Sequence, residues 1–285
     1  MGKKGTLRFD EINYWSEVKI EIIRKYAAAF SAIIAAQTAK GIPLKHLYID
    51  GFSGAGEHRL KSTGEMVPGS PLAVLSVKPP FMEYHLIDLD ERKTDHLRVT
   101  IGERPDVFIY TEDCNEVLTK RILPNVCYEQ YKRGLCLLDP YGLHLDWDVV
   151  RIAGATKAVE IFLNFPVSDM NRNVFWQNPK GVDPDDVERM NAFWGDDSWR
   201  RVTYTSIPAL FGDAVEMKTA DNRMIADAYR KRLMEVAGFK YVPEPIPMRN
   251  SNNADVYYLF FASPNATGAK IVGEIFEQYR NYGVR

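Results

Sequence analysis

The first long apolar pattern in the chain is helical. Between Tyr14 and Ala39, large apolar residues recur at steps of three and four positions, which gathers them on one face of an amphipathic helix. Gly41 and Pro43 come directly after this pattern, and such a pair commonly ends a helix. The sequence therefore predicts a long N-terminal helix before the pattern changes.

Short apolar runs then alternate with helical patterns. The runs predict five strands, over residues 46–49, 83–89, 107–113, 134–142 and 158–166. The helical patterns between them begin at Ser70-Pro71, at Glu91, at Asn115 and at Val149. Ser70 suits an N-cap because proline follows it at the first helical position. This alternation is typical of βαβ units, so we expect the α/β class: a doubly wound, mostly parallel sheet with helices on both faces.

The alternation stops after the fifth predicted strand. Residues 167–220 are polar and aromatic, and only one helix start is well marked, with Asp183 as N-cap and Pro184 behind it. A long helix from Asp221 to Val236 then resumes the pattern. The last predicted elements are strands near Tyr241 and over residues 257–262, and a closing helix from Gly268 to Tyr282.

Three segments follow from this pattern. Residues 1–45 are expected to form an N-terminal helical segment, and residues 46–166 together with 221–285 the sheet domain. Residues 167–220 are expected to form an insert that recognises a substrate or a partner. A chain of 285 residues with 46% hydrophobic residues can bury the core that such a domain requires.

Charge and cysteine content narrow the class of protein. The net charge of −2 argues against a protein whose whole surface binds nucleic acid. A local basic groove is still compatible with the 36 Lys and Arg residues. Cys114, Cys127 and Cys136 form no CxxC pair, so we expect reduced, mostly buried thiols and no metal site. The first residues lack the apolar core of a signal peptide, and no apolar run reaches the ~18 residues of a membrane span. The expected location is the cytoplasm, without membrane contact.

Acidic residues follow successive predicted strands. Asp50 follows the first strand, Asp88 the second, Asp113 the third and Asp139 the fourth. In a doubly wound sheet, ligands bind outside the carboxyl ends of the strands, so these acids are expected to meet at one edge. The first acid also begins a glycine-rich loop over residues 50–56, whose backbone amides can approach a ligand closely.

The glycine-rich loop favours a cofactor without phosphate groups. A nicotinamide cofactor prefers glycines that run directly into a helix, whereas here Glu57 follows Gly56 and the next predicted helix starts well downstream. S-adenosylmethionine fits better, because its cationic sulfonium and its ribose both favour carboxylates. Asp88 would accept from the ribose and Asp113 from the adenine amine, while Asp50 and the loop would face the methionine end. The predicted cofactor-binding residues are Asp50, Phe52, Ser53, Gly54, Gly56, Asp88, Asp113 and Asp139.

Each strand-end acid also has a second interpretation. An aspartate at the end of a strand is often the N-cap of the next helix, and Asp113 in particular could cap the helix that follows it. Asp88 and Asp90 could serve as caps in the same way. His58, in the loop expected after Gly56, is either a phosphate contact or an ordinary solvated residue. The occurrence of acids at successive strand ends, behind a glycine loop, favours the cofactor site.

The segment after the fourth predicted strand is the candidate for catalysis. Enzymes that methylate amines of nucleic acids place an acid or amide, two prolines and an aromatic residue there; here Gly142 replaces the second proline. Asp139 and the carbonyl of Pro140 would accept hydrogen bonds from an exocyclic amine, and Tyr141 would stack on a flipped base. The same residues also suit a tight turn. Asn164, after the fifth strand, would line the same pocket or form an Asx turn.

Several short motifs extend in order across nearly the whole chain. They are Trp15-Ser16-Glu17-Val18-Lys19 with Tyr26, YIDGFSGAG, PGSPLAVL, LLDPYGL with Trp147, EIFLNFP, FWGDDSW and YYLFFASPNATGAKI. In this order they resemble the three-Cys-motif partner protein (TcmP) family. The resemblance implies a Rossmann-like class I methyltransferase fold and a protein partner, encoded nearby, that carries the three-cysteine motif. The cysteines of this chain are not that motif.

We therefore expect an S-adenosylmethionine-dependent methyltransferase that acts on an amine of a nucleobase in RNA or DNA. Two alternatives stay open. The first is a methyltransferase fold that has lost its chemistry and serves as a binding module for a three-Cys-motif protein. The second is an oxidoreductase with a nicotinamide cofactor. Fold analogy alone does not choose between an enzyme and a module, and the sequence does not determine the oligomeric state.

Overall fold

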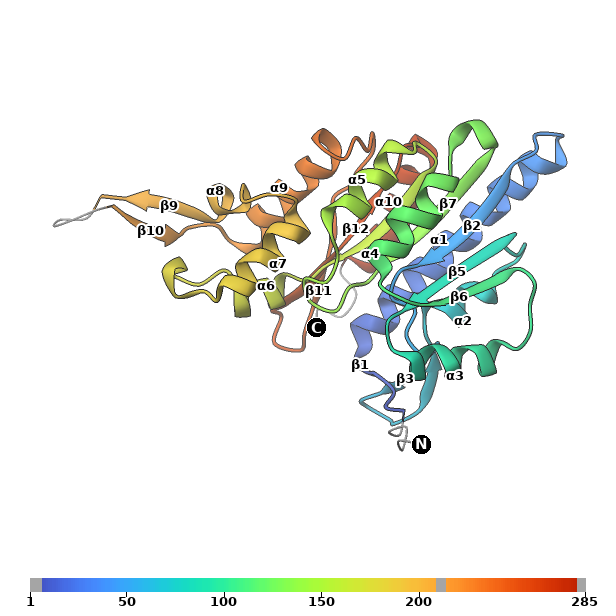
Figure 1. The fold of residues 1–285 in the computed structure, drawn as a ribbon, viewed down its shortest axis with the longest axis horizontal. Helices are drawn as coiled ribbons and strands as arrows, with labels where there is room; N and C mark the ends of the chain where they lie inside the picture. Colours follow the sequence, from blue (N-terminus) through green and yellow to red (C-terminus); the bar gives the residue numbers. More distant parts are fainter. Residues whose placement is uncertain (1–6, 209–213, 281–285) are drawn as a thin grey trace.

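A seven-stranded sheet forms the centre of the computed structural model, which describes residues 7–208 and 214–280 (Figure 1). Its strands are β2 (Lys45–Asp50), β5 (Glu83–Asp88), β6 (Val107–Thr111), β7 (Lys132–Leu138), β8 (Val159–Phe165), β11 (Ile246–Arg249) and β12 (Asp255–Ala262). Their spatial order is β11-β12-β8-β7-β2-β5-β6. The neighbours from β8 to β6 run parallel, whereas β12 is antiparallel to both β8 and β11. The predicted doubly wound, mostly parallel sheet is confirmed.

The order of the strands reverses between β2 and β7. The chain forms β2 first, places β5 and β6 on one side, and later adds β7 and β8 on the other side. Connections on the two sides leave in opposite directions, so a crevice opens at the carboxyl ends of these two strands. The antiparallel β12 lies between β8 and β11 and completes the seven-stranded sheet.

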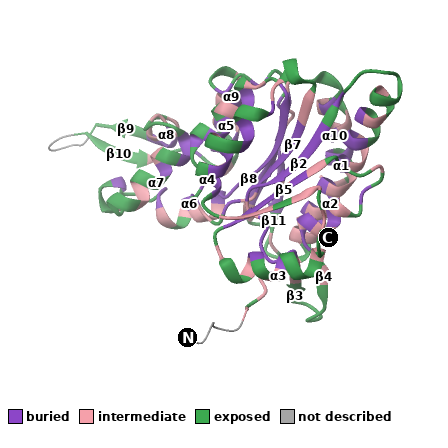
Figure 2. Ribbon diagram, turned by 45° about the vertical axis from the view of Figure 1, so that its right-hand side comes forward, coloured by how far each residue is buried: buried purple, intermediate pink, exposed green. Residues whose placement is uncertain are grey.

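Both faces of the sheet are buried (Figure 2). Successive side chains of a strand point to opposite faces, so each strand contributes to two cores. In β2, Tyr48 belongs to one hydrophobic core and Ile49 to the other. In β8, Phe162 and Leu163 divide in the same way. Each face therefore requires its own layer of helices.

The longest helix of the structure, together with three others, covers one face of the sheet. These helices are α1 (Tyr14–Ala39), α2 (Ser70–Leu75), α3 (Glu91–Ile101) and α10 (Ala266–Tyr279). The predicted N-terminal helix is confirmed over its full range, and it contacts both α2 and α10. The end predicted for the closing helix, Tyr282, lies outside the described residues.

The opposite face is covered by α4 (Cys114–Val117), α5 (Trp147–Ala155) and α9 (Asn222–Glu235). The helix predicted from Asn115 onward is only partly confirmed. After one α-helical turn it becomes a π-helix (Leu118–Ile122) and then a 3-10 helix (Leu123–Asn125), and a further 3-10 helix spans Tyr128–Gln130. Pro124 has no backbone N–H and its ring crowds the preceding turn, so an α-helix cannot continue through it.

Residues 167–220 form more elements than the sequence predicted. They are α6 (Val167–Asn173), a 3-10 helix (Pro179–Gly181), α7 (Pro184–Trp194), α8 (Trp199–Thr203), β9 (Tyr204–Ile207) and β10 (Val215–Lys218). Asp183 caps α7 as predicted, accepting from the backbone N–H of Asp185 at 2.9 Å. The paired strands β9 and β10 project from one end of the molecule (Figure 1). Elements of four to seven residues carry too little periodicity to be predicted from the sequence.

A small sheet replaces the loop predicted after Gly56. It consists of β1 (Glu11–Ile12), β3 (Glu57–Leu60) and β4 (Met66–Pro68), with β3 in the middle. The prediction was wrong because these strands are only two to four residues long, too short to show an alternation of polar and apolar positions. Ser70 is likewise not the N-cap of α2: Gly69 holds that position, and the Ser70 hydroxyl donates to Asp50 at 2.7 Å.

The strand predicted near Tyr241 is only a single bridge, to Ser263. The true neighbour of β12 is β11, which contains Pro247. Proline concealed this strand in the sequence, yet it is tolerated there because β11 lies at the edge of the sheet.

The three cysteines are free thiols. Cys114 and Cys136 are buried and Cys127 is half-buried. Within residues 7–208 and 214–280, no group of three or more His, Cys, Asp or Glu side chains is placed to hold a metal ion. No helix in the same ranges is both long enough and apolar enough to cross a membrane.

Candidate functional site

A cavity of about 460 Å³ lies at the carboxyl edge of the sheet; we call it the carboxyl-edge cavity. It is lined by the chain after β2, β7 and β8, and by β1 and α1 from the N-terminal segment. It therefore sits where the strand order reverses, the place at which doubly wound sheets bind their ligands.

The glycine-rich loop forms one wall of this cavity through Phe52, Ser53 and Gly54. The backbone N–H and the hydroxyl of Ser53 both donate to the carbonyl of Ile87, at 2.8 and 3.1 Å, which ties the loop to β5. Gly54 has a φ of +61° in the left-handed region, and no atom lies within 4 Å of the place where a Cβ would stand. The loop therefore exposes backbone to the cavity.

Gly56 is required for the packing of α3 and does not contribute to the cavity. Its φ is +83°, and a Cβ there would stand 2.5 Å from Cδ1 of Leu97 in α3. The residue does not line the cavity. Glycine is thus required at this position by the close approach of α3.

Asp50 lies beneath the loop, with none of its surface exposed. Its carboxylate accepts from the hydroxyls of Tyr48 at 3.0 Å and Ser70 at 2.7 Å, and from the backbone N–H of Phe52 at 3.2 Å. Burial raises the pKa of Asp50 to about 6 against the effect of these bonds. Asp50 does not line the cavity; its side chain bonds β2, the glycine-rich loop and α2 instead.

Asp88 and Asp113 both bind backbone groups. The carboxylate of Asp88 accepts from the N–H of Gly54 at 2.9 Å and of Asp90 at 2.8 Å, and burial raises its pKa. Asp113 is exposed and caps α4, accepting from the N–H of Glu116 at 3.1 Å. Neither side chain lines the carboxyl-edge cavity. Asp88 instead orients the loop that does.

Asp139 enters the cavity from the end of β7 and forms an ion pair with Lys19 of α1. Within the described residues, Lys19 is its only hydrogen-bonding partner. The Lys19 ammonium is almost fully buried and also lies 5.2 Å from the centre of the Tyr257 ring. Sequence reasoning gave Lys19 no role. A signal existed, because Lys19 falls on the buried stripe of α1 with Ile22 and Tyr26.

Tyr141 is held by two charged residues. Its hydroxyl accepts from the Lys93 ammonium at 2.8 Å and donates to Asp10 at 2.6 Å, and Lys93 lies 4.7 Å from the centre of its ring. Burial and the bond to Asp10 raise the pKa of Tyr141, while 52% of its surface remains exposed. Pro140 and Gly142 line the cavity beside it. The aromatic face is thus fixed at the cavity mouth.

Two buried polar atoms in the cavity have no partner among the described residues. They are Oδ1 of Asn164, at the end of β8, and Nδ1 of His58, in β3. A buried acceptor without a donor costs free energy, so a ligand that offers an N–H or O–H would be stabilised here. Burial also lowers the pKa of His58, which favours its neutral form.

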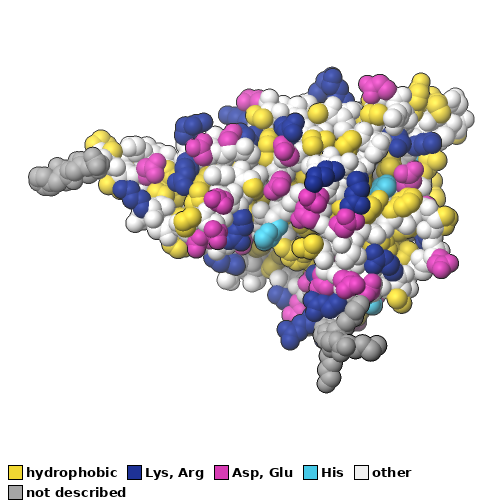
Figure 3. Space-filling model, in the orientation of Figure 1, with side chains coloured by type: hydrophobic (Ala, Val, Ile, Leu, Met, Phe, Trp, Pro, Cys, Tyr) yellow, Lys and Arg dark blue, Asp and Glu magenta, His cyan; other side chains and the backbone are white. Residues whose placement is uncertain are grey.

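The charges around the cavity are mainly negative. Carboxylates of Asp10, Glu11, Asp139 and Asp169 line it, against the cations of Lys19 and Arg172. Elsewhere the signs are mixed: Figure 3 shows Lys and Arg side chains interspersed with Asp and Glu over one face of the molecule. The excess of carboxylates favours a ligand with a positive charge.

Two solved structures are similar to this chain at low sequence identity. No protein-family model matches the chain, and no curated protein matches it. A Legionella pneumophila protein of the family-model DUF519 is 12% identical with a TM-score of 0.53, over 95% of this chain and 92% of its own. A Leishmania major protein described as an S-adenosylmethionine-dependent methyltransferase of the DUF858 family is 10% identical with a TM-score of 0.39, over 86% and 72%. The Legionella likeness shows a shared fold; neither likeness shows a shared activity.

Proposed function

We propose that the chain is an S-adenosylmethionine-dependent methyltransferase that acts on an amine of a nucleobase in RNA or DNA. One observation carries the proposal. The carboxyl-edge cavity lies at the strand-order reversal and is lined on one side by the glycine loop and on the other by Asp139-Pro140-Tyr141-Gly142. Donor and acceptor of a methyl group would meet between these two walls.

The residues at this edge suit the cofactor. S-adenosylmethionine supplies an activated methyl group on a cationic sulfonium, which the surplus of carboxylates favours. Gly54 leaves space for a close approach to the loop backbone. Beyond it, Asp88 and Asp113 would accept from the ribose and the adenine amine. Leu89, between them in sequence, is 72% exposed and offers an apolar surface to a base.

The residues after β7 and β8 would hold the amine. Lys19 bonds one oxygen of Asp139, so the other oxygen is available to an N–H of the substrate. The unpartnered Oδ1 of Asn164 is a second acceptor in the same cavity. Two acceptors on one amine group would direct its lone pair toward the methyl donor, and Tyr141 would stack on the base. Catalysis would then rest on positioning.

The first test is calorimetric titration of the full chain with S-adenosylmethionine and S-adenosylhomocysteine. We expect both to bind the wild type, and Asp88→Asn to weaken binding about tenfold, because its amide disturbs the two backbone bonds that shape the loop. Asp148→Asn, an exposed aspartate in α5 outside the cavity, is the matched control. Absence of binding to the wild type would contradict the proposal.

The second test identifies the substrate class. Transfer of a labelled methyl group to pooled RNA or pooled DNA, followed by digestion to nucleosides, would report the methylated base. We expect label on an exocyclic nitrogen. Label on a ring carbon or on the ribose would contradict the proposal that an amine is methylated, while leaving the cofactor proposal intact.

A second candidate function is a silent binding module that acts with a three-Cys-motif protein. It is supported by the internal bonds of the proposed catalytic groups, since Lys19 already binds Asp139 and Lys93 with Asp10 already holds Tyr141. The motifs that resemble the TcmP family also favour a protein partner. Cofactor binding without transfer to RNA, DNA or protein, together with a stable complex with such a partner, would select this candidate.

A further inference from the structure

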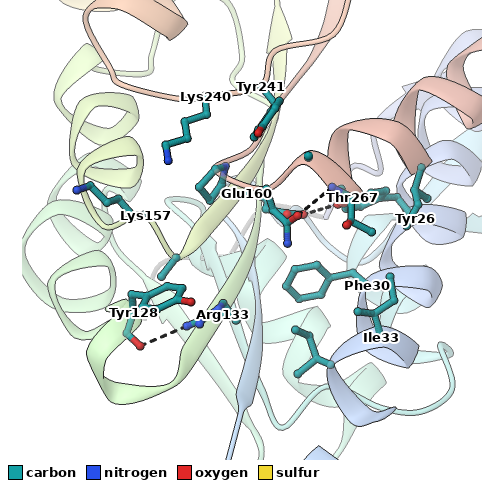
Figure 4. A pocket seen from close by; sticks show the side chains of 17 residues that line it. Tyr26, Phe30, Ile33, Tyr128, Arg133, Lys157, Glu160, Lys240, Tyr241 and Thr267 are labelled. Carbon is teal, nitrogen blue, oxygen red and sulfur yellow. Dashed lines mark hydrogen bonds between the residues drawn. The ribbon is translucent and has the colours of Figure 1, made fainter. Parts of the chain in front are cut away.

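A second cavity, of about 420 Å³, opens at the amino edge of the same sheet (Figure 4). We call it the amino-edge cavity. It lies where β7 and β8 begin and β12 ends, between α1 and the first turn of α10. None of its residues lines the carboxyl-edge cavity. The function proposed above makes no use of it.

A buried carboxyl group forms its floor. Glu160, at the start of β8, is only 5% exposed and accepts from the hydroxyls of Tyr26 and, at 2.8 Å, Ser263. Gly268 of α10 lies so close that a Cβ would stand 2.6 Å from Glu160 Oε1. Burial raises the pKa of Glu160 to about 7. The group is thus closed off by protein on one side and faces the cavity on the other.

Three cations line the cavity beside this floor. Figure 4 places Arg133, Lys157 and Lys240 on one side of the cavity, opposite Phe30 and Thr267. Within residues 7–208 and 214–280, none of the three forms an ion pair with a carboxylate. Like charges around one cavity repel one another, so an anion that reaches all three would be stabilised.

The backbone at Lys157 is strained. Its φ is +54°, in the left-handed region that favours glycine or asparagine, and a longer side chain there costs about 1 kcal/mol. Strained residues cluster at functional sites. The strain accompanies a lysine whose side chain lines the cavity.

Aromatic side chains form the rim. Tyr128 is 57% exposed and Tyr241 is 40% exposed, and the Arg133 guanidinium lies 3.9 Å from the centre of the Tyr128 ring. Exposed aromatic rings next to cations recognise planar bases joined to phosphates. A fatty acid would instead require an apolar floor, whereas here the floor is Glu160. The volume lies within the range of small-ligand sites, roughly 300–1,000 Å³.

We propose that the amino-edge cavity binds a small nucleotide, with its phosphate among Arg133, Lys157 and Lys240 and its base against the aromatic rim. Glu160 faces the polar groups of the same ligand. The site is separate from the carboxyl-edge cavity, and its occupation does not depend on the methyltransferase proposal.

The test is calorimetric titration of the full chain with GMP and UMP. Neither contains adenine, so neither mimics the adenosine of S-adenosylmethionine. We expect saturable binding of at least one of them below about 1 mM, and binding at least about tenfold weaker for guanosine, uridine and inorganic phosphate alone. Inorganic phosphate that binds as tightly as the nucleotides would show an anion site without base recognition and would overturn the proposal, as would no binding at all.

Two variants locate the site. Lys240→Gln and Lys157→Asn each remove one charge, and asparagine tolerates the left-handed backbone at residue 157. We expect each to weaken nucleotide binding about tenfold, whereas Lys180→Gln, an exposed lysine of the insert, leaves it unchanged. Wild-type affinity in both variants would overturn the proposal. Displacement of the nucleotide by S-adenosylmethionine would also overturn it, because the nucleotide would then occupy the carboxyl-edge cavity.

Discussion

At each of the two edges of the central sheet, one buried carboxyl group has the same set of side-chain donors. At the carboxyl edge, Asp50 accepts from a tyrosine hydroxyl and a serine hydroxyl; at the amino edge, Glu160 does the same. Burial raises the pKa of Asp50 to about 6 and that of Glu160 to about 7. The two groups are therefore chemically alike, and their surroundings decide what each can do.

The surroundings differ in access and in charge. Asp50 is sealed from the cavity above it, where four carboxylates face two cations. Glu160 lines its own cavity, where, among the residues that the structure describes, it is the only carboxylate beside three cations. Asp50 thus fixes the loop and α2, while Glu160 is placed to meet a ligand. A buried acid by itself indicates no function; the open side and the sign of the neighbouring charges do.

The largest expected effect is on methyl transfer at the carboxyl edge. Asp139→Asn should lower the rate about 10³-fold, because it removes the charged acceptor and leaves Lys19 without its ion-pair partner. Cofactor affinity should stay within about threefold. Steady-state assays with labelled cofactor would measure both, with Asp148→Asn as control. A rate within tenfold of the wild type would exclude Asp139 as the group that orients the amine.

The next expected effect is on the pH dependence of stability, to which both buried acids contribute. Folding raises the pKa of both acids, so each keeps a proton that it releases in the unfolded chain, and the stability that each contributes falls as pH rises. For Asp50 the loss runs from about pH 4 to about pH 6; for Glu160 it runs from about 4.5 to about 7 and totals about 3 kcal/mol.

Urea unfolding at pH 6 and pH 7 separates the two acids. Asp50 and the buried or half-buried histidines also titrate in this window, so the measurement is made relative to Glu160→Gln. From pH 6 to pH 7 the wild type should lose about 1 kcal/mol more than Glu160→Gln, and Asp50→Asn should keep this loss. Glu160→Gln should not show this additional loss of stability, because it has no carboxyl group at residue 160. An equal loss in Glu160→Gln would show that another group causes the pH dependence.

The smallest effect concerns the tyrosines that bind the two acids. Tyr26→Phe and Tyr48→Phe each remove one donor from a buried carboxyl group, which should cost about 1–2 kcal/mol of unfolding free energy at pH 8. Tyr131→Phe, at an exposed tyrosine, should cost less than about 0.5 kcal/mol. Equal values for all three variants would mean that neither hydroxyl supports its acid.

The carboxyl edge could be predicted from the sequence because the rules of the fold place it there. Once five strands were recognised, the residues that follow them had to lie at one edge, and the structure places Gly54 and Asp139 in one cavity. The prediction could not reveal that Lys19 binds Asp139, since the two residues stand 120 positions apart. It also could not distinguish Asp50, which is sealed in, from Phe52, which lines the cavity.

The cavity at the amino edge could not be predicted from the sequence for a similar reason. Glu160 looked like an ordinary position of a buried strand, and its partners Tyr26 and Ser263 lie 134 and 103 positions away. The sequence of a single chain does not show which residues so far apart come into contact in the fold. Most elements within residues 167–220 were missed for a different reason, because the helices α6 and α8 and the paired strands β9 and β10 have too few residues to show a period.

The most direct test of the account is hydrogen–deuterium exchange of the full chain with and without saturating S-adenosylmethionine. We predict slower exchange in residues 52–56 and 139–143, which border the carboxyl-edge cavity, and unchanged exchange in residues 264–268 at the amino edge. Protection confined to residues 264–268, or no protection anywhere, would contradict the assignment of the cofactor to the carboxyl edge.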